Sequence, residues 1–378
     1  MKFIDLNRQY EAYKGEIDEA VHSVLESGQF ILGEVVERLE AVLAGYVGVR
    51  HAIGVSSGTD ALVLALMACG VGPGDEVVTT PFSFIATAEA ISLVGARPVF
   101  VDIDPITYNM DPQAFKKILD ARSRSGSMPR CVIPVSLFGQ CPDMDEINDI
   151  AKTYGLHVIE DACQSFGARY KGRMSCAVSE IGVTSFFPSK PLGAYGDGGM
   201  LFTDDDEIAR MCISLRVHGQ SRRYIHEKIG LNARLDAIQA AILLVKFSHL
   251  EEELKKREEA AGFYTEGLKE IMPYITPPKV AGGRTCVFAQ YTVRVKGNLR
   301  DEVARFLEVH GVPTAVHYPR PIHLQPAFKY IGLPQGPFPH AEEASREVLS
   351  LPMHPFIKRE EQETVLAALR EALSSLVL

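Results

Sequence analysis

The chain contains the stretch Ser185-Phe186-Phe187-Pro188-Ser189-Lys190-Pro191-Leu192-Gly193, which is followed by Gly196-Asp197-Gly198-Gly199. This stretch places one lysine among small, aromatic and glycine residues, directly after a strand-like run. A desolvated setting favours the uncharged form of a lysine amine, which is the nucleophilic form. The pattern therefore indicates a lysine placed for chemistry, although most lysines in proteins are solvated surface charges.

A carboxylate upstream of this stretch indicates which chemistry. Asp161 ends the apolar run His157-Val158-Ile159, and a carboxylate buried at a strand end is costly unless a cation or a hydrogen-bond donor meets it. Lys190 and Asp161 together predict a site for pyridoxal 5′-phosphate (PLP), in which the lysine forms a Schiff base and the carboxylate keeps the ring nitrogen protonated. The alternative for Asp161 taken alone is that it caps the next turn.

Short β-branched runs alternate with helical patterns from about residue 50 to 216. The runs are Ala52–Val55, Glu76–Thr79, Pro98–Val101, Val132–Val135 and His157–Ile159, and helix-like stretches such as Ala61–Ala68 and Met144–Tyr154 lie between them. This alternation predicts an α/β fold with a mostly parallel sheet covered by helices on both faces. Ligands of such sheets bind at the carboxyl ends of the strands.

The second part of the chain has a different pattern. Residues 236–270 read as one long helix, apolar at first and strongly charged later, which we interpret as a connector between domains. A strand at 290–295, a helix near 300–310 and a terminal helix from about Glu360 follow it. We expect a large three-layer αβα domain over residues 1–250, and a smaller C-terminal α+β domain over residues 251–378.

The composition is that of an ordinary globular protein, with 46% hydrophobic residues, 23% charged residues and a net charge of −9. The negative charge argues against a general affinity for nucleic acid or for an anionic membrane. The first residues have no signal-peptide core and no long apolar run is present, so we expect a cytoplasmic protein. The seven cysteines are scattered without a C-x-x-C pair, which supports neither a disulfide framework nor a metal site.

A second motif follows the first predicted strand. Ser57-Gly58-Thr59 opens a helix, where free backbone N–H groups and the helix dipole favour a phosphate. Taken alone, the motif is also an ordinary helix N-cap. Ser185 could donate to the same phosphate or be a strand-end hydroxyl, and Phe84 could stack on a flat ring or belong to the core.

These motifs together resemble one family over essentially the whole chain. The chain is similar to the DegT-type PLP-dependent aminotransferases, which act on nucleotide-linked keto-sugars and have the fold type I architecture. The resemblance rests on five segments of the sequence: 57–62, 160–164, 185–190, 196–199 and Val316-His317-Tyr318-Pro319.

The resemblance implies a role for each site residue. Lys190 carries the cofactor and Asp161 holds its ring nitrogen. Gln164 lies near the phenolic oxygen of the ring, and Phe84 stacks on the ring. The phosphate is bound by Gly58, Thr59 and Ser185, and by Asn232 of a neighbouring subunit, which implies a homodimer with a shared active site.

The resemblance also bears on the substrates. L-glutamate is the implied amino donor, and the motifs look most like those of enzymes that aminate a UDP-linked 2-acetamido-3-keto-glucuronic acid for surface polysaccharides such as lipopolysaccharide. A uronate carboxylate needs a cationic partner. Arg234 is the first candidate for that partner, and His317 and Tyr318 match a loop near the sugar. A structural role for His317 remains the alternative.

Two other functions are compatible with the fold. PLP-dependent sugar dehydratases and epimerases share it, but the dehydratases carry histidine at the position of Lys190, and epimerisation stays open. A PLP-binding regulator without catalysis is the alternative outside enzymes.

Overall fold

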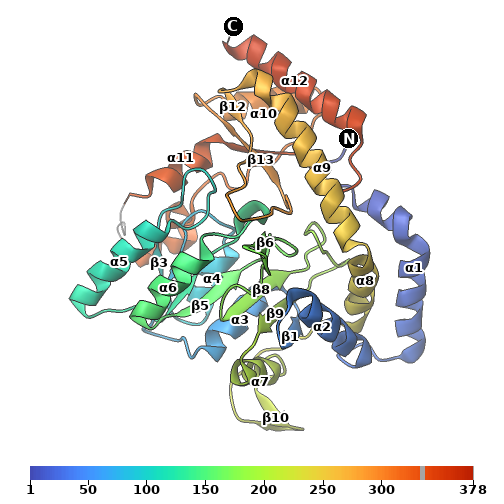
Figure 1. Cartoon of the computed structure of the whole chain (residues 1–378). Helices are drawn as coiled ribbons and strands as arrows, with labels where there is room; N and C mark the ends of the chain where they lie inside the picture. The colour runs from blue at the N-terminus through green and yellow to red at the C-terminus, as the bar shows by residue number, and fades with distance from the viewer. Residues whose placement is uncertain (333–336, 378) are drawn as a thin grey trace.

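Between residues 51 and 161 the chain alternates between strands and helices, as its sequence predicts (Figure 1). The computed structural model describes residues 1–332 and 337–377. Its helices are α1 Leu6–Ser27, α2 Glu34–Val47, α3 Gly58–Ala68, α4 Ala86–Leu93, α5 Pro112–Ser125, α6 Met144–Tyr154, α7 Asp206–Leu215, α8 Ala237–Ser248, α9 Leu250–Leu268, α10 Arg300–Val309, α11 Pro339–Glu347 and α12 Arg359–Val377. Its strands are β1 His51–Val55, β2 Glu76–Thr79, β3 Arg97–Phe100, β4 Cys131–Ile133, β5 His157–Asp161, β6 Arg169–Tyr170, β7 Arg173–Met174, β8 Ile181–Ser185, β9 Gly199–Thr203, β10 Gln220–Arg222, β11 Ile225–His226, β12 Ile275–Thr276, β13 Tyr291–Val295 and β14 Val348–Leu351.

The main sheet has seven strands in the order β1-β9-β8-β5-β4-β2-β3. β9 runs antiparallel to both of its neighbours, and the pairs β8–β5, β5–β4, β4–β2 and β2–β3 are parallel. β4 ends at Ile133, two residues earlier than expected, because Pro134 has no N–H group to donate to a ladder. Because β1, β2, β5 and β8 all run in the same direction, their carboxyl ends lie along one edge of the sheet.

Successive residues of each strand enter two different cores, as the alternation of side chains along a strand requires. Ile53, Val77 and Ile159 pack in a cluster with α3, α4 and α7 on one face. On the other face, Ala52 packs with α2 and α8, while Val78 and Val158 pack with α5 and α6. Both faces are thus covered by helices, which gives the three-layer arrangement that the alternating sequence predicts.

The C-terminal part has its own core around the sheet β12-β13-β14. The last turns of α9 pack there with α10 and α12, while Leu250 and Leu254 at the start of α9 pack in the large domain. The predicted division at residue 250 therefore falls at the start of a helix that belongs to both cores. Ile322, Phe328 and Ala341 also return to pack on the large domain. The amino terminus lies beside α12 in Figure 1, at the end of the molecule opposite β10 and α7.

The single long helix expected over residues 236–270 is wrong, because the structure has two helices, α8 and α9, which meet at His249. The His249 ring stacks on the Tyr13 ring of α1, with 3.9 Å between ring centroids. Its Nε2 atom lies 3.1 Å from a carboxylate oxygen of Glu16. These contacts with α1 accompany the change of direction between α8 and α9.

Candidate active site

Most of the predicted site residues collect at the carboxyl edge of the main sheet. Asp161 is the last residue of β5 and Ser185 is the last residue of β8. Gly58 begins α3 shortly after β1, and Phe84 lies between β2 and α4. Because these strands run in the same direction, their ends bring together segments that are far apart in the sequence.

The Asp161 carboxylate is buried and has two hydrogen-bond donors. The Thr87 hydroxyl donates to Oδ2 at 2.7 Å, and the Cys163 backbone N–H donates to Oδ1 at 3.2 Å. Each carboxylate oxygen is thereby fixed in direction. The sequence analysis did not predict a role for Thr87. Its one signal in the sequence is a hydroxyl side chain in the first turn of α4, the helix that follows β2.

Lys190 lies in the loop after β8, and the residue is partly buried. Within residues 1–332 and 337–377, no hydrogen bond or ion pair engages its Nζ atom. Burial lowers the pKa of this amine below its usual value of 10.5, although Cys163 and Asp161 raise it in part. A fraction of the amine larger than in a surface lysine is therefore uncharged and nucleophilic.

The turn before α3 packs directly against the end of β8. The Ser57 hydroxyl caps the helix by accepting from the Asp60 N–H at 3.0 Å. A Cβ atom on Gly58 would lie 2.8 Å from the Ser185 Cβ, so only glycine allows this approach. The N–H groups at the start of a helix are not used within the helix, and together with the Ser185 hydroxyl they form a cradle suited to a phosphate.

Phe84, Gln164, His317 and Tyr318 form the other side of the site. The Gln164 side-chain amide donates to the Tyr318 hydroxyl at 3.1 Å. The Phe84 ring is 56% exposed, and its centroid lies 6.1 Å from that of Tyr318. Burial, and then the charge of Lys190, lower the pKa of His317 to about 4, so this imidazole is neutral at pH 7. Its Nδ1 atom lies 2.9 Å from the Ser350 hydroxyl.

The structure does not bring Asn232 and Arg234 into contact with these residues. The Ser56 N–H donates to the Ala233 carbonyl at 3.2 Å, so the segment that holds both residues runs beside the phosphate turn of its own chain. The Asn232 side chain is nevertheless exposed. The Nε atom of Arg234 is buried without a hydrogen-bond partner in the described part of the chain.

The residues present fit the predicted cofactor. Asp161 offers a fixed buried carboxylate for a protonated ring nitrogen, and Lys190 offers an unpaired amine for an aldehyde. The cradle at Gly58 and Ser185 suits the phosphate, and the exposed face of Phe84 suits a flat ring. Each part of PLP thus has a chemically matched group at this edge of the sheet.

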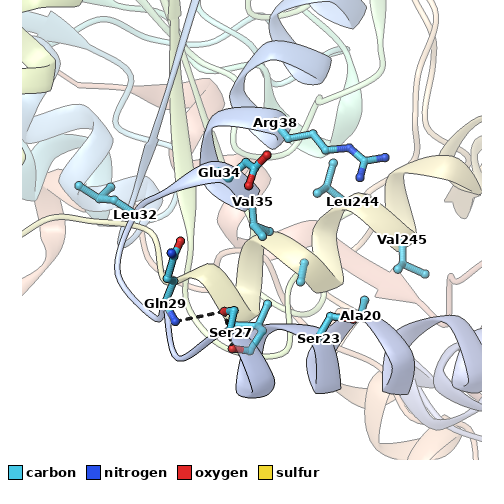
Figure 2. Close-up of a pocket in the computed structure, with 12 residues that line it drawn as sticks. Ala20, Ser23, Ser27, Gln29, Leu32, Glu34, Val35, Arg38, Leu244 and Val245 are labelled. Atoms are coloured by element: carbon cyan, nitrogen blue, oxygen red, sulfur yellow. Dashed lines mark hydrogen bonds between the residues drawn. The ribbon is translucent and has the colours of Figure 1, made fainter.

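Other features lie away from this site. A cavity of about 500 Å³ between α1, α2 and α8 is lined by residues that include Val24, Leu32, Arg38 and Leu244, and by none of the predicted site residues (Figure 2). In the described residues, no three His, Cys, Asp or Glu side chains are grouped so that they could hold a metal ion. None of the described helices is long and apolar enough to cross a membrane.

Comparisons with known proteins agree with this geometry. The family described as the DegT/DnrJ/EryC1/StrS aminotransferase family matches residues 11–370. A UDP-2-acetamido-2-deoxy-3-oxo-D-glucuronate aminotransferase from Pseudomonas aeruginosa is 48% identical over 369 residues, which cover 98% of this chain and 99% of that protein. A protein from Geobacillus stearothermophilus named a pleiotropic regulatory protein is 47% identical over 369 residues, which cover 97% of each chain.

A solved structure is similar along the same length. DesV of S. venezuelae, in complex with a ketimine intermediate, is 40% identical and superposes with a TM-score of 0.93, covering 98% of this chain and 97% of that one. The predicted fold class is therefore confirmed.

Proposed function

Because the chain belongs to the DegT/DnrJ/EryC1/StrS aminotransferase family, it is a PLP-dependent aminotransferase, and we propose that it transfers an amino group from L-glutamate to a nucleotide-linked keto-sugar. The observation that carries this proposal is the partly buried amine of Lys190, which no side chain of the described residues bonds, near the buried carboxylate of Asp161. The bound cofactor supplies an electron sink for the carbon that bears the amino group.

The chain's own residues supply binding and proton transfer. Asp161, oriented by Thr87, would hold a proton on the ring nitrogen. The cradle at Gly58 and Ser185 would bind the phosphate, and Phe84 would cover one face of the ring. Lys190 Nζ, with its lowered pKa, would accept and return the proton that moves when the amino group is transferred.

We propose a sugar with a carboxylate, a UDP-linked 2-acetamido-3-keto-glucuronic acid, as the acceptor. The P. aeruginosa relative is named for such a substrate. The buried Nε atom of Arg234 lacks a hydrogen-bond partner in the part of the chain that the structure describes, and a guanidinium offers two parallel charge-assisted hydrogen bonds to a carboxylate. His317 and Tyr318, beside Lys190 and Gln164, would contact the sugar. We place the reaction in the cytoplasm, as a step toward surface polysaccharides.

A homodimer with a shared active site would bring Asn232 and Arg234 of one copy to the cofactor site of the other. Asn232 is exposed, and the Nε atom of Arg234 has no hydrogen-bond partner among the described residues, which is compatible with their serving the site of a second copy. The hairpin β10–β11 and the segment after it also expose the apolar side chains of Tyr224, Ile225 and Ile229. These side chains would be covered if a second copy packed there.

Two other functions are less well supported. The Geobacillus relative is named as a regulator, but a regulator needs no lysine with a lowered pKa and a free amine. A dehydratase or epimerase would leave the amino donor unused, which the following assay detects.

The main test is an assay of the purified protein with L-glutamate and UDP-, dTDP- and GDP-linked keto-sugars, read by mass spectrometry. We expect 2-oxoglutarate and an amino-sugar nucleotide in equal amounts. Lys190→Ala should abolish turnover, whereas Lys256→Ala, at a partly exposed lysine that contacts Glu252 and the Phe356 ring, should not. Loss of water from the sugar without amino transfer, or full activity of Lys190→Ala without added amine, would contradict the proposal.

The substrate is tested by comparing a uronate with its uncharged analogue in wild type and in Arg234→Ala. Loss of a buried charge pair costs about 2–5 kcal/mol, so kcat/KM should fall more than tenfold for the uronate and much less for the analogue. An equal fall for both sugars would mean that Arg234 does not recognise the carboxylate.

Site sharing is tested with mixed dimers of Asn232→Ala and Lys190→Ala. If Asn232 serves the partner's site, one site of the heterodimer carries both defects and the other carries neither. The mixture should therefore regain about one active site per heterodimer. Heterodimers as inactive as their parents would exclude sharing.

A further inference from the structure

The loop that carries Lys190 is anchored to α8 at two points. The side-chain oxygen of Gln239 accepts a hydrogen bond from the Tyr195 backbone N–H at 2.9 Å. The Lys246 Nζ atom donates to the backbone carbonyl of Gly193. Gln239 and Lys246 are seven residues apart in one helix, so they lie two turns apart on the same face. That face of α8 is therefore directed at the loop.

The loop itself is tightly closed. The Lys190 N–H donates to the Phe187 carbonyl at 2.9 Å, and the Ala194 N–H donates to the Phe186 carbonyl at 2.7 Å. A Cβ atom on residue 193 would lie 2.5 Å from the Pro188 carbonyl oxygen, so the loop needs glycine there. Fixing the Gly193 carbonyl therefore fixes the backbone on both sides of Lys190.

Lys246 lies in an unusual place for a lysine, with only 2% of its surface exposed. Glu253 and Arg257 of α9 are the charged groups that act on it, and its Nζ atom lies 4.9 Å from the centroid of the Tyr195 ring. Burial lowers its pKa to about 8, against the opposing effect of Glu253. A buried ammonium group is costly, and the bond to Gly193 gives it a defined partner.

The helix α8 that carries both anchors is packed against α1 and α2. Leu243 of α8 lies in one buried cluster with Leu39 and Leu43 of α2. Ile242 of α8 packs with Tyr13 and Ile17 of α1. A loop bonded to α8 therefore takes its position from three packed helices and not from a mobile surface segment.

We propose that Lys246 is a positioning residue for Lys190, which holds the catalytic loop through the carbonyl of Gly193 and thereby fixes where the Lys190 amine lies. No side chain of the described residues bonds the Lys190 amine, so its location follows from the backbone of the loop. The inference rests on the proposed role of Lys190.

The test uses Lys246→Met, which keeps an unbranched side chain shorter by one atom and removes the donor, with PLP bound. Amide hydrogen exchange should become about 10- to 100-fold faster in a peptide that covers residues 187–196, because one charge-assisted hydrogen bond is lost. The turnover number kcat should fall at least about fivefold, while KM for the amino donor stays unchanged. Lys246→Arg retains a donor, so its amide exchange in residues 187–196 and its kcat should be close to those of wild type.

The matched control is Lys256→Met. Lys256 is a partly exposed lysine of α9 that pairs with Glu252 at 2.7 Å and lies over the Phe356 ring, both outside residues 187–196. We expect wild-type exchange in residues 187–196 and wild-type kcat in this variant.

Three results would overturn the inference. One is wild-type exchange and kcat in Lys246→Met. Another is a rise in exchange as large throughout α8 and α9 as in the loop, which would give Lys246 a general structural role. If Lys246→Met does not fold, the variant Gln239→Leu tests the second anchor instead. Wild-type hydrogen exchange at the Tyr195 amide in Gln239→Leu would be the third contradicting result. Full activity of Lys190→Ala would instead refute the proposed function, and the exchange data would still report on the anchor.

Discussion

Replacing Gly58 with alanine tests whether the turn before α3 must approach β8 as closely as it does. The new Cβ atom would lie 2.8 Å from the Ser185 Cβ and 2.9 Å from the Cys163 Sγ. Carbon atoms in contact are about 3.5–4.0 Å apart. The turn or the end of β8 must therefore move by roughly 0.7 Å or more in the variant.

The size of the effect follows from this crowding. Adding a methyl group to a well-packed region costs about 1–3 kcal/mol. In the free protein the turn can relax away from β8, but a bound phosphate requires the N–H groups of Gly58 and Thr59 in their original positions. If the full cost appears on binding, the dissociation constant for PLP rises by about fivefold to about 150-fold.

Equilibrium dialysis of the cofactor-free protein against PLP measures this change. Gly45→Ala in α2 is the matched control, because its added Cβ meets no atom within 4 Å, and its affinity should equal that of wild type. The double variant Gly58→Ala/Cys163→Ala removes the contact with sulfur and should regain part of the affinity. Wild-type affinity in Gly58→Ala would refute this turn as the phosphate site.

Two further predictions concern other parts of the molecule. Thr87→Val removes the hydroxyl that donates to Asp161, so PLP affinity and kcat should fall by about tenfold to about 150-fold in dialysis and steady-state kinetics. Thr87→Ser should retain most of both, and a serine variant as impaired as the valine variant would contradict this role. Hydrogen bonds from Arg8 lower the pKa of Glu361 to about 2, below its usual value of 4.5. The pair therefore stabilises the folded protein above pH 4.5, and this stabilisation is lost as the pH falls toward 2. Because the pair is partly exposed, Arg8→Met should lower the free energy of unfolding by about 1–2 kcal/mol at pH 7, and by much less at pH 2. Denaturant titrations measure both values, and equal losses at the two pH values would contradict this prediction.

The polar side chains of the site differ in how they are held in position. Asp161 is oriented by a hydroxyl and a backbone N–H, and Gln164 is oriented by the Phe138 N–H, which donates to its Oε1 atom at 2.8 Å. The Lys190 amine, in contrast, has no hydrogen-bond partner among the described residues, while the Lys190 backbone N–H is bonded to the Phe187 carbonyl. This division suits a site in which the carboxylate must stay in place while the lysine amine moves a proton.

The sequence alone determined the layered fold and the main residues of the site. Strands and helices follow from local periodicity, and the end of a parallel strand marks the edge where ligands bind. Asp161 and Ser185 end such strands, and Gly58 opens the helix after another. These features depend on neighbours in the chain, which a sequence displays directly.

The tertiary structure alone decided which distant residues support that site. Thr87 reaches Asp161 across 74 positions, and Lys246 reaches Gly193 across 53. The division of the expected long helix at His249 likewise accompanies contacts with α1, more than 200 positions away. No local pattern marks these residues, because a threonine in a helix or a lysine after an apolar run has the same periodicity whether or not a partner lies opposite it. Their roles exist only once packing has fixed which segments meet.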